Sequence, residues 1–198
     1  MSWQPYAVPP APPKRPPLTR AQRTGALVAG AVGFSVFSWG LALLAFSAIA
    51  TVLVAIFSFV VGLARQGPVD RGTLRFVQWV EGIDGSIVGW VIVGGFLLAS
   101  ILLIVGFFVS QGILRGGRVN RPTAVTWSSI GIALVAGSIV GSLGGLIGSM
   151  FGWVAWVDPG VAIAVTTLSG LLSLAVTAAV GAFTWWWMAH VFRASAAD

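Results

Sequence analysis

The sequence predicts an all-α membrane protein: a bundle of four transmembrane helices, with a short amphipathic extracytoplasmic helix between the first two. Of the 198 residues, 57% are hydrophobic and only 8% are charged. A soluble domain carries about 25% charged residues, so these few charges are not enough to cover a water-exposed globule. The charges also lie in clusters between four long apolar runs, and each run exceeds the roughly 20 residues that cross a bilayer. Because lipid offers the backbone no hydrogen bonds, we expect these runs to be helices.

The four apolar runs are preceded by a segment of different composition. Residues 1–24 hold seven of the ten prolines together with four basic residues. Proline fixes φ and lacks an N–H group, so we expect a Pro-rich, basic, extended cytoplasmic tail there. Residues 25–198 form the predicted four-helix transmembrane domain, with spans within 25–64, 85–114, 122–157 and 159–192.

The first run allows two interpretations. Its 40 residues would extend about 60 Å as one helix, roughly twice the hydrocarbon thickness of a bilayer. The alternative is a pair of short spans joined by a hairpin near 34–40, which gives five spans in total. The basic residues favour one long helix, because cytoplasmic loops carry the excess of Lys and Arg.

The four-span topology predicts a multi-pass protein of the cell membrane with both termini in the cytoplasm. Three basic residues, Arg65, Arg71 and Arg75, then lie outside, and eight lie inside; five spans would give four outside and seven inside. The eight inside are Lys14, Arg15, Arg20, Arg23, Arg115, Arg118, Arg121 and Arg193.

A short amphipathic helix is predicted over 73–83, between the first two spans. Phe76, Val77, Val80 and Ile83 share one face at helical spacing. Such a helix suits the outer membrane surface, with its apolar side in the interface. Packing over the bundle as a lid is the second possibility, and the sequence favours neither.

Capping and aromatic residues mark the ends of the predicted spans. Asp84 and Asp158 each precede an apolar run, where a carboxylate accepts hydrogen bonds from the first free amides of a helix. Tryptophans gather near span ends, as they do at membrane interfaces, and a terminal arginine reaches the head groups. The predicted interface anchors are Trp153, Trp156, Trp185, Trp186, Trp187 and Arg193.

The third and fourth spans carry small residues at four-residue intervals, a glycine-zipper pattern. Helices in lipid associate by close packing, which glycine permits. The predicted packing face comprises Gly137, Gly141, Gly144, Gly145, Gly148, Gly152, Ser169, Ser173, Thr177 and Gly181. Two interpretations stay open for the glycines: a self-association face that builds a homo-oligomer, or packing of the third helix inside its own bundle. The hydroxyl groups either line a wet path or pack against the third helix.

Several classes of function are excluded by what the spans lack. No Asp, Glu, Lys or Arg lies inside them, and the single histidine, His190, falls at the end of the last. Pumps and proton-coupled transporters rely on such intramembrane groups. Cysteine is absent, so thiolate chemistry and cysteine metal sites are excluded. We therefore predict no enzyme, no catalytic or metal-binding residue and no cofactor, and clustered loop charges argue against nucleic acid as a partner.

These observations favour a function based on helix packing. The sequence predicts a small non-enzymatic integral membrane protein, acting as an accessory or scaffold protein or as an oligomeric membrane subunit. Its expected partners are the lipid bilayer and either itself or another membrane protein, reached through the small-residue faces. The alternative is a homo-oligomeric channel or facilitator for small neutral solutes, lined by hydroxyl groups of the third and fourth spans.

Overall fold

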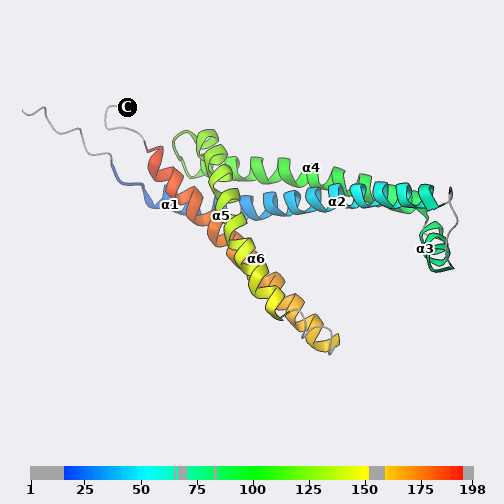
Figure 1. The fold of residues 1–198 in the computed structure, drawn as a ribbon. Helices are drawn as coiled ribbons and strands as arrows, with labels where there is room; N and C mark the ends of the chain where they lie inside the picture. The colour runs from blue at the N-terminus through cyan, green and yellow to red at the C-terminus, as the bar shows by residue number, and fades with distance from the viewer. Residues whose placement is uncertain (1–15, 65, 67–70, 83, 152–158, 194–198) are drawn as a thin grey trace, which may run out of the picture.

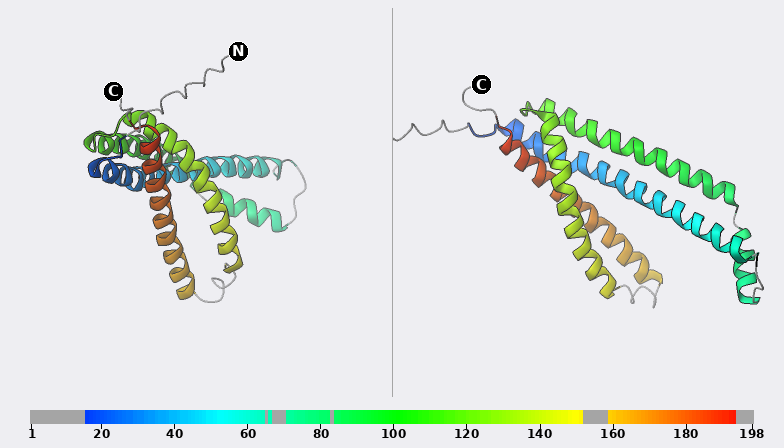
Figure 2. Two further views of the ribbon diagram at one scale, coloured as in Figure 1. Left: turned by 90° about the vertical axis from the view of Figure 1, so that its left-hand side faces the viewer. Right: turned by 45° about the horizontal axis from the view of Figure 1, so that its top comes forward.

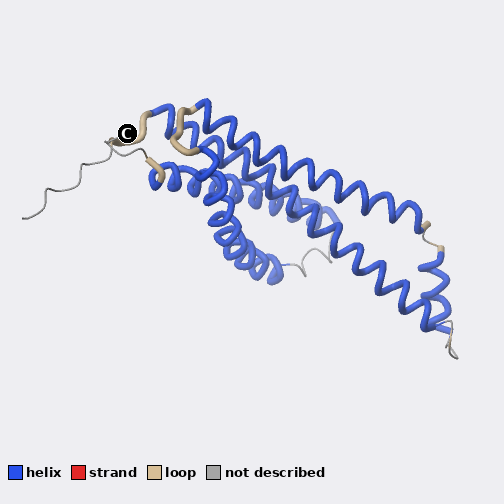
Figure 3. The backbone as a smooth tube through the Cα atoms, turned by 90° about the horizontal axis from the view of Figure 1, so that it is seen from above, coloured by secondary structure: helices blue, strands red, loops and turns tan. Residues whose placement is uncertain are grey.

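The computed structural model describes residues 16–64, 66, 71–82, 84–151 and 159–193. Every regular element in these residues is helical, which confirms the predicted all-α class; Figure 3 shows the helices along nearly all of the described chain. In chain order they are α1 (Arg20–Val28), the π-helical turn η1 (Ala29–Phe34), α2 (Ser35–Ala64), α3 (Arg71–Glu81), α4 (Gly85–Gly116), α5 (Pro122–Phe151) and α6 (Pro159–Val191).

Four of the helices are long and apolar enough to cross a membrane. They comprise Arg20–Ala64, Gly85–Gly116, Pro122–Ser142 and Gly160–Val191. The number of spans agrees with the sequence prediction. This pattern is that of a multi-pass membrane protein.

The first of these helices is continuous. α1, η1 and α2 follow one another without a break, giving 45 helical residues, Arg20–Ala64, and a length of about 68 Å. The chain stays helical through 34–40, where a hairpin was the alternative. The physical reason is that this stretch holds no proline, asparagine or charged residue at which a turn would form.

The first helix begins at Arg20, inside the segment that composition predicts to be an extended tail. Thr19 is the N-cap residue: its Oγ1 accepts a hydrogen bond from the Gln22 N–H, and the Gln22 Oε1 accepts one from the Thr19 N–H. This reciprocal capping box satisfies free amides at the helix start. The local cap therefore outweighs the prolines that precede it.

The long helices form two antiparallel hairpins that meet at one end (Figure 1, Figure 2). α2 and α4 lie side by side along one arm, and α5 and α6 lie along the other. The first helix joins both arms, because α1 and η1 contact α6 while α2 continues beside α4. The arms diverge from this junction, so the ribbon has the outline of a V.

The hydrophobic core lies at the junction. Farther along the arms, large apolar side chains are exposed, including Trp90 at 76% and Ile163 at 70%. Extended apolar surface of this kind is typical of a protein that contacts membrane or other proteins. The core residues are Leu18, Ala26, Ala29, Phe34, Leu114, Val119, Val125, Ile130, Ala133, Trp185, Met188 and Ala189.

The short helix α3 lies at the far end of the α2–α4 arm (Figure 1). It spans Arg71–Glu81, close to the predicted 73–83. Of the four residues of its predicted apolar face, only Val77 has a described side chain, and this side chain is buried. Ile83 and the side chains of Phe76 and Val80 lie outside the described part.

Candidate functional site: a helix crossing around the π-helical turn

The junction is built around η1, where the first helix winds more widely than an α-helix. In a π-helix each N–H pairs with the carbonyl five residues back, an arrangement often found at functional positions. The six residues of η1 include Gly30 and Gly33, and both are buried. Helices α4 and α6 both pack against this turn. It is therefore the place where the two arms are joined.

Helix α6 crosses η1 at a contact between two glycine backbones. A Cβ atom added to Gly181 would lie 2.9 Å from Cβ of Phe34 and 3.0 Å from the carbonyl carbon of Gly30. A Cβ atom added to Gly30 would overlap the Gly181 carbonyl group. No side chain fits on either residue without moving a backbone, which is how glycine allows two helices to approach closely.

Helix α4 crosses the same turn from another side. A Cβ atom added to Gly106 would lie 2.7 Å from the backbone nitrogen of Phe37 and 2.9 Å from the carbonyl oxygen of Gly33. A Cβ atom added to Gly33 would lie 2.9 Å from Cβ of Ser110. Small residues thus face each other on both sides of η1.

One hydrogen bond from a hydroxyl group joins α4 to the first helix at this crossing, and a second lies within the first helix. Ser110 is buried, and its Oγ donates to the carbonyl oxygen of Ala29 over 3.1 Å. Within the first helix, the Ser35 Oγ donates to the carbonyl oxygen of Ala31 over 2.6 Å. Both acceptors belong to the π-helical turn, where the pairing register of the backbone shifts.

Trp185 lies within the core of the junction. Its side chain is 0% exposed, and its ring centroid is 5.8 Å from that of Phe34, with the planes tilted by 45°. Its indole Nε1 has no hydrogen-bond partner among the described residues. A buried indole N–H normally has a partner, so burial of this group disfavours folding and the apolar contacts of the ring offset it.

Helices α5 and α6 carry buried hydroxyl groups near the junction, and one of these groups bonds the two helices together. The Ser129 Oγ donates to the carbonyl oxygen of Thr184 over 3.4 Å. The Thr184 Oγ1 in turn donates to carbonyl oxygens of its own helix, including that of Val180 at 2.9 Å. The Thr126 Oγ1 likewise bonds to the carbonyl oxygen of Pro122 at 2.9 Å. These hydroxyl groups are satisfied by backbone atoms, as buried polar groups must be.

The predicted packing face is divided between the junction and the arms. Gly181 lies at the crossing, whereas a Cβ atom added to Gly137 or Gly141 would have nothing within 4 Å. For Gly144, Gly145 and Gly148 the structure describes only their place in helix α5, and Gly152 lies outside the described residues. Ser169 and Ser173 are exposed on α6, and Thr177 is half-buried.

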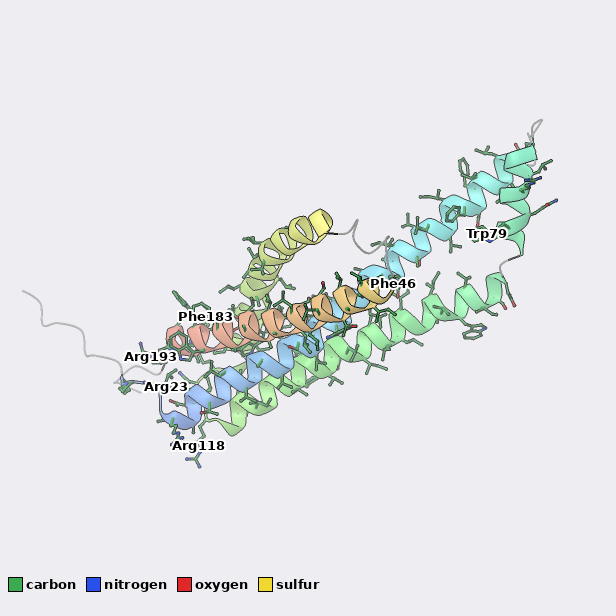
Figure 4. All side chains as sticks on the ribbon, turned by 90° about the horizontal axis from the view of Figure 1, so that it is seen from below. Arg23, Phe46, Trp79, Arg118, Phe183 and Arg193 are labelled. Atoms are coloured by element: carbon green, nitrogen blue, oxygen red, sulfur yellow. The ribbon has the colours of Figure 1, made fainter. Side chains whose placement is uncertain are left out.

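The predicted interface anchors differ from one another in burial. Trp185 is in the core, so its ring faces protein and not head groups, while Trp187 is 53% exposed. Trp186 is half-buried against His190, with ring centroids 4.4 Å apart. Arg193 is half-buried at the end where Arg23 and Arg118 also lie (Figure 4). Trp153 and Trp156 are outside the described part of the chain.

Sequence reasoning missed the residues that build the crossing in the first and second spans. These are Gly30, Gly33, Gly106 and Ser110. The signal was present, because Gly106 and Ser110 are four residues apart, the spacing of small residues on one helix face. The predicted face was based instead on the longer glycine repeat of the third span and the small residues of the fourth.

The contacts described at the junction are helix packing and hydrogen bonds. Within the described ranges, no group of three or more His, Cys, Asp or Glu side chains is placed to hold a metal ion. The chain matches no known protein family, and no curated protein or solved structure is significantly similar to it. Its function must therefore be inferred from its own geometry.

Proposed function

We propose that the protein is a non-enzymatic accessory or scaffold subunit of the cell membrane, which packs its open small-residue face on α5 against another transmembrane helix. The partner is a second copy or another membrane protein. The observation that carries this proposal is the open space beside Gly137 and Gly141, in contrast to the filled crossing at Gly181. A helix that shows glycine to its surroundings allows a second backbone to approach closely in lipid.

The hydroxyl groups of this part of α5 support a packing role. The Ser138 Oγ donates to the carbonyl oxygen of Val135, and the Ser142 Oγ donates to that of Ser138, both over 2.8 Å. Because both hydroxyl groups donate to carbonyl oxygens of their own helix, they add little bulk to the face and need no partner on another helix. The neighbouring side chains are apolar and exposed, including Val135 at 63%. Such a surface fits a helix better than it fits a polar solute.

The proposed orientation places the junction in the cytoplasmic half of the bilayer. Arg23, Arg118 and Arg193 lie at the junction end, and Trp79 of α3 lies at the opposite end (Figure 4). The excess of basic residues near one set of helix ends favours the cytoplasm for that side. On this proposal, both termini are cytoplasmic and α3 lies at the outer surface as an interfacial helix.

A pair of α5 variants tests the proposal. Gly141→Leu fills the open face, whereas Gly131→Leu adds the same side chain to the same helix about 80° away from Gly141 and also has nothing within 4 Å. We expect Gly141→Leu to reduce at least tenfold the recovery of co-purified membrane proteins, including a differently tagged second copy. Gly131→Leu should keep them, and both variants should keep the parent melting temperature.

Two results would contradict this function. Unchanged recovery of all partners with Gly141→Leu would show that the face contacts only lipid. The second is solute flux through liposomes that contain this protein alone. If Ser173→Leu abolished such flux, the channel interpretation would replace the scaffold interpretation.

A further inference from the structure

The turn between α4 and α5, residues 117–121, carries two arginines in unusual backbone conformations. Arg118 has φ 54° and Arg121 has φ 49°, and they are the only non-glycine residues with positive φ in the described chain. This left-handed region is costly for any residue that has a Cβ atom. Such strain persists only where the surroundings enforce it, and it is often associated with function.

Arg118 occupies a position at which glycine is the usual residue. The Val119 N–H donates to the Leu114 carbonyl oxygen, and the Arg118 N–H donates to that of Arg115, both over 3.0 Å. This pair of hydrogen bonds is a Schellman motif, whose left-handed position is most often glycine. Two glycines, Gly116 and Gly117, directly precede this position, yet the left-handed residue is arginine.

Arg121 likewise stands where another residue type would be less strained. It precedes Pro122, the first residue of α5, and its carbonyl oxygen accepts from the Val125 N–H over 3.1 Å. This is the N-cap position, at which Ser, Thr, Asp and Asn are preferred because their side chains accept amide hydrogen bonds. A guanidinium group has no acceptor and gives no such cap.

The turn that carries both arginines is held to the rest of the protein by one buried side chain and two hydrogen bonds. Val119, between them, is buried in the junction core. The Gln22 Nε2 donates to the Arg118 carbonyl oxygen over 3.0 Å, and the Asn120 Nδ2 donates to that of Phe192 over 3.2 Å. The turn is thereby bonded to the first helix and to the residue that follows the last helix.

The described charged residues near the turn are all basic. Arg20 and Arg23 are exposed at the start of α1, beside the turn that Gln22 contacts. Among the described residues, the acidic ones are Glu81 and Asp84, which belong to α3 and the start of α4 at the opposite end of the α2–α4 arm. The basic end therefore has no described carboxylate to neutralise it.

Two other arginines near the turn, Arg115 and Arg193, donate hydrogen bonds to the protein, unlike Arg118 and Arg121. The Arg115 Nη2 donates to the Gln111 Oε1 over 3.3 Å, and the Arg193 Nε donates to the His190 carbonyl oxygen over 3.0 Å. Both Arg118 and Arg121 are exposed, and no hydrogen bond from either guanidinium group to a described residue is seen.

We propose that Arg118 and Arg121 form a binding site for the phosphate group of anionic phospholipids in the leaflet at the junction end. A guanidinium group binds phosphate through two parallel N–H groups, and basic residues beside a membrane attract anionic lipid. The inference rests on the proposed membrane insertion and orientation, and it adds a ligand at a site distinct from the α5 face.

The test uses the full-length protein, delipidated in neutral detergent and titrated with short-chain phosphatidylglycerol or phosphatidylcholine. We expect the parent to prefer phosphatidylglycerol. Arg118→Gly and Arg121→Asn should each weaken its binding about fivefold, and the double variant about twenty-five-fold. Arg118→Gly also relieves the left-handed strain, so its melting temperature should equal or exceed that of the parent.

Two controls separate this site from general charge. Arg75→Gln removes a positive charge from α3 at the opposite end and should leave phosphatidylglycerol binding unchanged. Inorganic phosphate at the same concentration as the lipid should fail to displace it, because free phosphate lacks the acyl chains that contact the apolar helices. Equal losses in Arg75→Gln, displacement by an equal concentration of free phosphate, or unchanged binding in the double variant would each overturn the proposal.

Failure of the proposed membrane function would give a different experimental result from failure of the lipid site. A protein that is not embedded in lipid would be extracted from membranes by alkaline carbonate, whichever arginine it carries. Loss of association with Gly141→Leu reports on the α5 face and is independent of the turn between α4 and α5.

Discussion

The glycines of the junction and the described glycines along the α5–α6 arm have the same chemistry and opposite surroundings. At the junction, an added Cβ on Gly181 or Gly106 would meet backbone atoms at 3.0 Å or less. On the α5–α6 arm, an added Cβ on Gly141 or Gly170 would meet nothing within 4 Å. The first pair is required for the chain to close on itself, and the second pair is available to a partner or to lipid. A glycine pattern therefore identifies a surface that permits close approach, and only tertiary structure identifies what approaches it.

The largest effect that would test this contrast is expected from two leucine substitutions on helix α6. Gly181→Leu forces a branched side chain into the Gly30 backbone and should cost more than about 3 kcal/mol, because overpacking against backbone cannot be relieved by a rotamer change. Gly170→Leu on the same helix should leave stability near that of the parent. Thermal unfolding in detergent, followed by tryptophan fluorescence, measures both. A parent-like Gly181→Leu would mean that the crossing is not formed as described.

A smaller effect is expected from the hydrogen bond that fastens the crossing. Ser110→Ala leaves the Ala29 carbonyl without its buried donor and should cost about 1 kcal/mol. Ser138→Ala is the matched control, because that hydroxyl bonds within an exposed turn of α5 and should cost far less. If Ser110→Ala and Ser138→Ala lost the same stability in thermal unfolding, the hydrogen bond at the junction would stabilise the protein no more than the one on the arm.

The smallest effect is expected at the far end of the α2–α4 arm, from the cap at Asp84. The Ser86 hydroxyl donates to Asp84 Oδ1 over 2.7 Å and the Ser86 N–H over 2.9 Å, and these hydrogen bonds lower the pKa of the Asp84 carboxyl group. A lowered pKa in the folded state means that the cap contributes stability above the unfolded-state pKa. This contribution is lost as pH falls through the folded-state pKa.

Asp84→Asn provides the comparison for this cap. Asparagine caps a helix about as well as aspartate and does not titrate. The melting temperature of the parent should therefore fall more than that of Asp84→Asn between neutral pH and a pH below 3.8, the ordinary pKa of the carboxyl group. Identical pH profiles for the two proteins would show that the carboxylate does not stabilise this helix end.

The helices could be predicted from sequence because their signals are local. Asp84 and Arg115 bound the charge-free run, so the predicted 85–114 differs by only two residues from the observed helix α4. The start of the first helix at Arg20 could also have been predicted, since Thr19 and Gln22 have the spacing of a capping box. The prolines of residues 1–24 favoured an extended tail instead.

The contacts between helices could not be predicted, because spacing defines a face and not its partner. The consecutive tryptophans show the limit. Trp185, Trp186 and Trp187 look like one interfacial belt in the sequence, but residues on a helix rotate by about 100° each. The first of them is buried, the second half-buried and the third exposed. Which one turns inward depends on the crossing at Gly181, four residues earlier.

The make-up of the junction also constrains the order in which the protein is completed during synthesis. Its core draws on residues from Leu18 to Ala189, nearly the full span of the chain. Helices α2 and α4 can pair as soon as α4 is made, because they are close in sequence. The junction must wait for α6 to supply Gly181 and Trp185. Until the ribosome has passed these residues, the Gly30 face of the nascent first helix stays unoccupied and open to a chaperone or a second chain.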